Sequence, residues 1–263
     1  MRPFLLLPLL LAGCSGTPAA RDPFAGRRWI DLSHEFSSET IYWPTAMPFR
    51  LDSVFRGQTP GGWHYEANNF SAAEHGGTHL DAPIHFATAH LTAEQVPLTS
   101  LIGLTVVVDV RDSARGNRDY RIEPADLQRW EQRQRQPIPT GAVVLLRTGW
   151  GSRWPDRAQY LGTTKTGADA VPELHFPGLS PAAAERLVQG YHVKAVGIDT
   201  PSIDYGQSTT FATHQVLAEA DVPIFENVAN LDSLPPIGAY VIALPMKIRG
   251  GSGGPLRIVA ALP

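Results

Sequence analysis

Residues 142–147 read AVVLLR, and residues 105–110 read TVVVDV. Both runs are almost wholly apolar and rich in β-branched residues, a pattern typical of strands buried on both faces of a sheet. Further strand-like runs occur at 29–32, 194–198, 240–244 and 256–260. Gly, Pro and Asp residues bound these runs, as expected for strands that end in turns.

Helical segments are expected between these strands, at 124–133, 181–189 and 213–219. Ser180 is suited to cap the second of them, and Pro181 fits its first turn because proline lacks an N–H that would otherwise be unpaired there. Strands that alternate with helices predict an α/β fold with a mixed β-sheet core and flanking helices.

The chain has 263 residues, of which 43% are hydrophobic and 18% are charged. This composition supplies a packed core and lacks the low hydrophobicity of disordered chains. No internal repeat and no long polar linker follow residue 26, so a single domain over 26–263 is predicted. The net charge is −3, and no basic run exceeds Arg27-Arg28. Nucleic acid is therefore excluded as a main partner.

The N-terminus reads MRPFLLLPLLLAGC, which joins a basic residue, an apolar run and small residues before Cys14. This order is typical of a secretory signal, and the run is too short to span a bilayer. Leu11-Ala12-Gly13-Cys14 resembles the lipobox of bacterial lipoproteins; the alternative is an ordinary signal peptide that contains a cysteine. We predict a signal peptide at 1–13, a flexible tether at 14–25, and lipidation of Cys14. Acyl chains would then anchor the protein to the cell envelope, on the periplasmic side of the outer membrane.

Residues 75–86 read HGGTHLDAPIHF and place His75, His79, Asp81 and His85 within eleven positions. The two glycines between the first two histidines disfavour a helix, so a turn followed by an extended segment is predicted. In an extended segment His79 and Asp81 point to the same side. Pro83 then restricts this piece to a sheet edge or a loop.

Imidazole and carboxylate groups are suitable ligands for Zn²⁺ or Mn²⁺. Cys14 is the only cysteine, so neither an internal disulfide nor a thiolate cluster is available, and metal binding depends on histidine and carboxylate. An ion held by three protein ligands keeps a position for water, whose pKa it lowers towards about 7. The alternative is that these histidines are separate surface or core residues; we favour a metal site because four ligand-type residues surround two glycines and a proline.

The HGGTHLDAPIHF segment resembles the H-x-G-T-H-x-D-x-P-x-H signature of the cyclase family of metal-dependent hydrolases, which includes bacterial kynurenine formamidases and isatin hydrolases. Weaker similarities follow in the family's order at 30–34, 42–44, 197–204, 213–214, 226–227 and 245–257. The resemblance implies a swivelling β/β/α fold, a small-molecule substrate, and a homodimer or homotetramer.

The resemblance also implies roles for individual residues. The implied metal ligands are His75, His79, Asp81, His214 and Glu226, with Asp81 able to bridge two ions. His85 matches the general acid/base and Trp43 an aromatic residue that packs on the substrate. Formamidases of the family are implied to use two zinc ions and isatin hydrolase-like members a single manganese, so Zn²⁺ or Mn²⁺, as one or two ions, is expected.

The implied activity is hydrolysis of a C–N amide bond in a small N-formyl aromatic compound or cyclic amide. For His85, the alternative is a fourth ligand position. For the whole chain, the alternative is a metal- or ligand-binding lipoprotein without turnover. Kynurenine formamidases act in tryptophan catabolism, which is usually cytoplasmic. Export of this protein therefore favours a substrate met outside the cytoplasm.

The remaining motifs have structural interpretations. His34 is expected to be a structural hydrogen-bonding residue, His64 and His90 surface residues, and His175 part of a loop. Residues 250–254 read GGSGG, and because no Gly-Lys-Ser/Thr follows, a tight loop is expected there and not a phosphate-binding loop.

Overall fold

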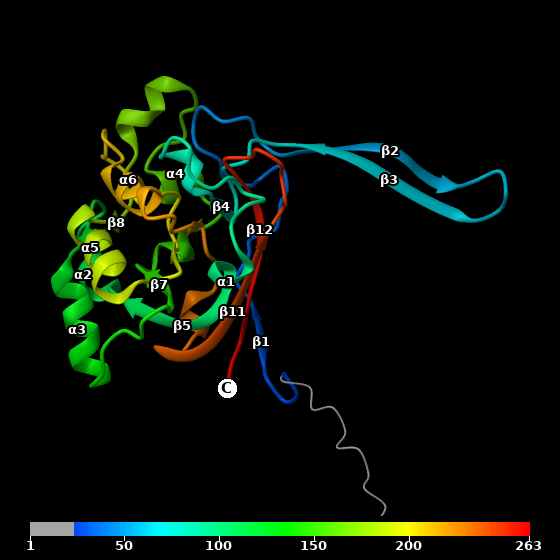
Figure 1. Ribbon diagram of the computed structural model, residues 1–263. Helices are drawn as coiled ribbons and strands as arrows, with labels where there is room; N and C mark the ends of the chain where they lie inside the picture. Colours follow the sequence, from blue (N-terminus) through cyan, green and yellow to red (C-terminus); the bar gives the residue numbers. More distant parts are fainter. Residues whose placement is uncertain (1–23) are drawn as a thin grey trace, which may run out of the picture.

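A computed structural model describes residues 24–263, so the predicted signal peptide, Cys14 and most of the predicted tether lie outside the described residues. The strands are β1 (Trp29–Asp31), β2 (Arg50–Gln58), β3 (His64–Ser71), β4 (His79–Asp81), β5 (Ile102–Asp109), β6 (Arg121–Ile122), β7 (Val143–Arg147), β8 (Gly178–Leu179), β9 (Ala195–Ile198), β10 (Ile224–Glu226), β11 (Ile237–Pro245) and β12 (Gly253–Ala261). The helices are α1 (Leu98–Leu101), α2 (Arg111–Ala114), α3 (Pro124–Gln134), α4 (Arg157–Leu161), α5 (Pro181–Glu185) and α6 (Ala212–Glu219) (Figure 1). All six strands and all three helices predicted from the sequence are confirmed.

The main sheet has eight strands in the order β1-β12-β11-β5-β7-β9-β10-β4. The central strands β5, β7, β9 and β10 are parallel, and the remaining pairs are antiparallel. Strand β4 also pairs with β12, which closes the sheet into a barrel. The predicted mixed α/β sheet is therefore confirmed, and its closure places β4 between two distant parts of the chain.

Strand β7 shows why its sequence is apolar at every position. Val143 and Leu145 belong to a buried cluster that takes residues from strands all round the barrel and so fills its interior. Val144 and Leu146 face the other way, into a second cluster shared with the outer helices. Because successive side chains of a strand point to opposite faces, a strand covered on both sides must be apolar throughout.

Helices α3, α5 and α6 cover one outer face of the sheet (Figure 1). The Ser180 side chain accepts a hydrogen bond from the Ala183 backbone N–H at 3.2 Å, so the predicted cap of α5 is confirmed. The predicted helix over 181–189 continues past α5 as a π-helical turn, Arg186–Gly190. Within residues 24–263, no helix is both long enough and apolar enough to cross a membrane.

The hairpin β2–β3 projects away from the barrel (Figure 1) and has no counterpart among the predicted strands. Its residues are exposed on nearly every position, so its sequence lacks the alternation that marks a half-buried strand. Several large apolar side chains of this hairpin are exposed, including Leu51, Val54, Trp63, Tyr65 and Phe70.

Strand β4 follows the predicted glycine turn; of the two placements expected for this piece, a sheet edge or a loop, the first is wrong for β4 and the second is right for Pro83. Leu80 pairs with Phe225 of β10 on one side and with Gly254 of β12 on the other. Pro83 lies just beyond the strand, at the start of a 3₁₀ turn over Pro83–His85, where its missing N–H breaks no sheet hydrogen bond.

Candidate metal centre

The turn before β4 requires both of its glycines. Gly77 has a φ of +56°, a left-handed conformation that glycine adopts without strain. Gly76 lies against the Tyr42 ring so closely that a Cβ atom would come within 2.0 Å of it. The turn therefore brings His75 back towards the side chains of β4, and the predicted arrangement of turn and extended segment is confirmed.

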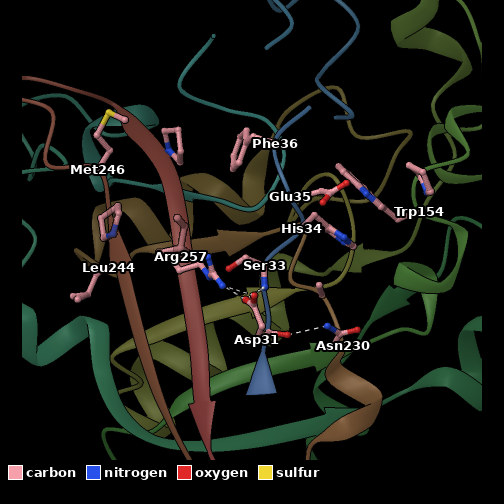
Figure 2. A pocket seen from close by; sticks show the side chains of 15 residues that line it. Asp31, Ser33, His34, Glu35, Phe36, Trp154, Asn230, Leu244, Met246 and Arg257 are labelled. Carbon is pink, nitrogen blue, oxygen red and sulfur yellow. Dashed lines mark hydrogen bonds and ion pairs between the residues drawn. The ribbon is translucent and has the colours of Figure 1, made fainter. Parts of the chain in front are cut away.

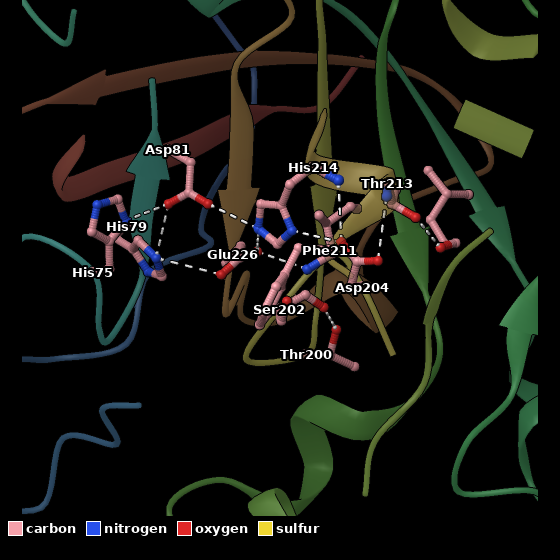
Figure 3. Close-up of polar contacts among 12 residues, drawn as sticks. His75, His79, Asp81, Thr200, Ser202, Asp204, Phe211, Thr213, His214 and Glu226 are labelled. Carbon is pink, nitrogen blue, oxygen red and sulfur yellow. Dashed lines mark hydrogen bonds and ion pairs between the residues drawn. The ribbon is translucent and has the colours of Figure 1, made fainter. Parts of the chain in front are cut away.

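A first cluster of ligand-type atoms consists of His75, His79 and Asp81. The Asp81 Oδ1 atom lies 2.6 Å from His75 Nδ1 and 3.2 Å from His79 Nε2. As predicted, His79 and Asp81 point to the same side of the strand (Figure 3).

A second cluster consists of Asp81, His214 and Glu226. The other oxygen of Asp81, Oδ2, lies 3.3 Å from His214 Nε2, and Glu226 Oε1 lies 3.2 Å from the same nitrogen. Glu226 Oε2 is also 3.5 Å from His79 Nε2, so the two clusters adjoin (Figure 3). Asp81 thus presents one oxygen to each cluster, the geometry of a carboxylate able to bridge two ions.

Hydrogen bonds orient two of the histidines. His79 Nδ1 lies 2.9 Å from the Gly77 carbonyl oxygen, and His214 Nδ1 lies 2.7 Å from Asp204 Oδ2. With Nδ1–H donating in each case, the Nε2 lone pair faces the cluster, as a metal ligand requires. The Asp204 carboxylate also accepts the backbone N–H groups of Thr213 and His214, so it holds the first turn of α6 as well as the imidazole.

The charges of the clusters depend on one another. Burial disfavours protonation of His79 and His214, but the adjacent carboxylates outweigh it and raise the pKa of both imidazoles. Burial likewise opposes ionisation of Asp81, but the surrounding histidines lower the pKa of its carboxyl well below the usual range. Burial and the charge of Asp81 raise the pKa of Glu226. Positive charge is therefore favoured beside the carboxylates of Asp81 and Glu226.

The donor set fits a divalent cation. Imidazole nitrogens and carboxylate oxygens, directed inwards from a buried site, are the ligands that Zn²⁺ and Mn²⁺ accept. A cation between Asp81 and Glu226 would relieve the repulsion of two buried carboxylates. Three protein donors per cluster leave coordination positions open to water or substrate.

A cavity of about 290 Å³ opens onto the clusters. Its polar end is formed by histidines, and its wall is mainly aromatic and aliphatic. Trp43 and Phe86 both lie near Phe211, with ring centroids 6.3 Å and 5.5 Å away from it. Trp43 therefore lies where an aromatic residue could contact a substrate.

His85 lines the same cavity and belongs to neither cluster. Its ring stacks on that of His75, with centroids 3.8 Å apart and planes 15° apart. His85 is an exposed residue, and desolvation of the part of its ring that packs against His75 and Phe86 lowers the pKa of His85 to about 4. A neutral imidazole thus lies beside the candidate metal position.

A larger open groove, of about 1070 Å³, lies elsewhere on the molecule (Figure 2). Its polar side chains are largely paired, as in the ion pair between Arg257 and Asp31 at 2.6 Å, and it contains neither cluster. His34 faces this groove, and the expectation that it is a hydrogen-bonding residue is wrong for its ring. The ring stacks on Trp154 at 4.1 Å, and its Nε2 atom is buried without a hydrogen-bond partner among the described residues.

The other histidines lie away from the clusters. His64 is exposed on the hairpin, and His90 pairs with Asp221 at 3.0 Å on the outside of the molecule. His175 precedes β8 and pairs with Asp119 at 2.8 Å, outside the cavity.

Sequence reasoning missed Asp204, Phe86 and Phe211. Asp204 lies ten residues before His214, and only the loop between them brings the carboxylate to the imidazole. Phe211 has a left-handed φ of 50° at the start of α6, which no local pattern predicts for an aromatic residue.

The fold and the site together define a single-domain α/β barrel with a buried histidine–carboxylate centre that could hold metal ions. The family model described as "Putative cyclase" matches residues 30–205, more than half of the chain, and the chain belongs to this cyclase family. It is homologous to isatin hydrolases and kynurenine formamidases.

Three relatives illustrate the similarity. An isatin hydrolase of Roseibium aggregatum is 31% identical over 198 residues, covering 72% of this chain and 72% of the relative. A kynurenine formamidase of Erythrobacter litoralis is 30% identical over 235 residues, covering 89% of this chain and 93% of the relative. The structure of isatin hydrolase A from Labrenzia aggregata bound to benzyl benzoate superimposes with a TM-score of 0.80 at 31% identity, covering 90% of this chain and 94% of that one.

Proposed function

We propose that this protein is a metal-dependent amidohydrolase that cleaves the C–N bond of a small cyclic amide or N-formyl aromatic compound. The observation that carries the proposal is the pair of clusters sharing Asp81 at the end of an aromatic cavity, with His85 beside them but outside both. The homologous isatin hydrolases and kynurenine formamidases support the reaction class.

The cavity sets the size and character of the substrate. Its volume of about 290 Å³ lies at the small end of ligand pockets, so one or two rings fill it. Trp43, Phe86 and Phe211 would pack against an aromatic ring. Among the described residues, the lining contains no lysine or arginine to pair with an amino-acid carboxylate, which favours an isatin-like lactam over N-formylkynurenine.

His75, His79 and Asp81 would hold one ion, and Asp81, His214 and Glu226 a second. A bound ion supplies Lewis acidity, polarising the amide carbonyl and lowering the pKa of water. The clusters hold the carbonyl end of the substrate, while the aromatic wall orients the ring and excludes water.

His85 would carry a proton from the attacking water to the leaving nitrogen. Because burial lowers its pKa to about 4, its imidazole is neutral near pH 7 and can accept a proton from the attacking water. The same low pKa makes the resulting imidazolium a strong acid, which can protonate the leaving nitrogen. The rival role, a fourth metal ligand, predicts that removal of His85 weakens metal binding.

The experiment compares metal content and hydrolysis in purified protein supplied with Zn²⁺ or Mn²⁺. Isatin, formanilides and N-formylkynurenine are the substrates, and we expect metal-dependent hydrolysis that is fastest for isatin. The competing proposal is a metal- or ligand-binding lipoprotein without turnover. Bound metal without hydrolysis of isatin, the formanilides or N-formylkynurenine would favour that alternative.

Export and anchoring are proposed from residues 1–14 alone. In a bacterial host, the wild type should incorporate labelled fatty acid and fractionate with the outer membrane. Cys14→Ala should do neither. Equal labelling of both proteins would contradict lipidation of Cys14.

We also propose a homodimer or homotetramer, supported by the hairpin β2–β3. A two-stranded hairpin is marginally stable by itself in water, and this one exposes Trp63, Tyr65 and Phe70. Light scattering of the predicted domain, residues 26–263, measures its mass in solution. A monomeric mass at micromolar concentration would contradict the assembly.

A further inference from the structure

His75 differs from the other two clustered histidines in what lies on its outer side. His75 Nε2 is 2.8 Å from the Ser252 hydroxyl oxygen, and that oxygen is 2.6 Å from Glu74 Oε2. The Ser252 backbone N–H also donates to Glu74 Oε2 at 3.0 Å. A carboxylate, a hydroxyl and an imidazole thus form a continuous chain that ends at the first cluster.

The loop over 250–254 reaches His75 because its glycines lack side chains. A Cβ atom at Gly253 would lie 2.6 Å from His75 Cε1 and 2.3 Å from the Leu80 carbonyl oxygen. A Cβ atom at Gly251 would lie 2.9 Å from Ile248 Cβ and 2.9 Å from Glu74 Oε1. Contacts this short exclude a side chain at either position, so the glycines allow Ser252 to approach both partners.

The hydrogen bonds that run from His75 through Ser252 to Glu74 have one consistent direction. A carboxylate can only accept, so the Ser252 O–H donates to Glu74, and the Ser252 oxygen accepts from His75 Nε2–H. The Asp81 carboxylate can also only accept, so His75 Nδ1–H donates to Asp81 Oδ1 at 2.6 Å, and a bound cation would replace that proton on Nδ1. The hydrogen bond to Ser252 therefore keeps a proton on Nε2, so that Nδ1 is the atom of His75 that can bind an ion of the first cluster.

We propose that Ser252 and Glu74 are positioning residues that fix the ring and tautomer of His75 for metal binding. The inference rests on the proposed metal site and adds to it the role of the glycine-rich loop. His79 and His214 are oriented directly by a carbonyl oxygen and a carboxylate, whereas His75 depends on a hydroxyl supplied by a segment far along the chain.

The test is direct titration of the metal-free full chain with Zn²⁺ and with Mn²⁺ by calorimetry. We expect Ser252→Ala to lower the affinity for the ion of the first cluster by about 10-fold to 100-fold, the usual range for groups that orient a metal ligand. Ser252→Thr keeps the hydroxyl and should restore most of the affinity. Glu74→Gln should show a smaller loss, since its amide oxygen still accepts from Ser252.

The matched control is Glu94→Gln. Glu94 accepts the backbone N–H of Gly250 at 3.0 Å, so it contacts the same loop without touching Ser252 or His75. We expect wild-type affinity from this variant. The absorption spectrum of the Co²⁺-loaded proteins gives a second measure, and it should change in Ser252→Ala and remain unchanged in Glu94→Gln.

The outcomes separate this inference from the proposed function. Wild-type protein that binds neither Zn²⁺ nor Mn²⁺ would overturn both. Wild-type binding together with unchanged affinity and Co²⁺ spectra in Ser252→Ala and Glu74→Gln would overturn only the positioning role. Should Ser252→Ala not fold, Glu74→Gln alone decides the question.

Discussion

The first cluster comes from the single segment 75–81, whereas the second joins Asp81 to side chains from helix α6 and strand β10. The His75 side chain is 23% exposed and borders His85, but those of His214 and Glu226 are only 4% and 5% exposed. The second cluster also contains one more carboxylate and is oriented by a third, Asp204.

This difference indicates that the two adjoining sites have different roles. The open first cluster lies next to the only proposed acid/base, so chemistry is expected there. The closed second cluster places more negative charge around its ion and admits less water, so that ion should be held more tightly. Four substitutions test this difference in roles.

Asp81→Asn should have the largest effect because both clusters share this carboxylate. We expect the purified variant to retain less than one tenth of the wild-type metal and to show no measurable turnover. Elemental analysis and a hydrolysis assay provide the two measurements. Asp31→Asn, which alters an exposed carboxylate of β1 paired with Arg257, is the matched control. Wild-type metal content in Asp81→Asn would rule out the shared site.

His85→Ala should leave both clusters intact and remove the proton carrier. We expect wild-type metal content and a fall in kcat of about 10²-fold to 10⁴-fold, the range for loss of a general acid/base. His90→Ala changes a histidine of the same segment that lies outside the cavity, and it should behave as the wild type. Full activity in His85→Ala would disprove the acid/base role, and metal loss would support the ligand role.

Glu226→Gln separates the clusters, since Glu226 is a ligand-type residue of the second alone, although its charge also lies 3.5 Å from His79 Nε2. With Zn²⁺ we expect two ions per wild-type chain and one per variant chain, with part of the turnover preserved. Mass spectrometry under non-denaturing conditions counts the ions. An unchanged count would show that Glu226 is not a ligand, and complete loss of metal would show that the clusters are not independent.

Asp204→Asn should have the smallest effect because its amide oxygen can still accept a hydrogen bond from His214. We expect affinity for the second ion to fall by about 10-fold, with the first ion unaffected. Ser208→Ala is the control, because Ser208 also bonds Asp204 without contacting His214. Equal affinities in all three proteins would remove Asp204 from the second site.

The same comparison shows what could be predicted from the sequence. Val143 to Leu146 reveal a doubly buried strand because burial on both faces demands apolar residues at every position. The first cluster could be found as well, since its ligand-type residues are neighbours in the chain. Barrel closure could not, because the pairing of β4 with both β10 and β12 depends on long-range register.

The roles of Asp204 and Ser252 were equally inaccessible. Each contacts the imidazole of a histidine distant in the sequence, and neither spacing nor periodicity encodes that contact. Resemblance to the cyclase family singled out His214 and Glu226, whose shared site with Asp81 no local pattern reveals.

Closure of the barrel also bears on when the protein becomes functional during synthesis. Strand β4 pairs with β12, and Ser252 contacts His75, so the centre uses residues translated about 175 positions after its first histidine. A nascent chain that has emerged only as far as residue 226 contains every ligand-type side chain but lacks the strand that completes their framework. Metal acquisition should therefore wait until β12 has been synthesised and has paired with β4.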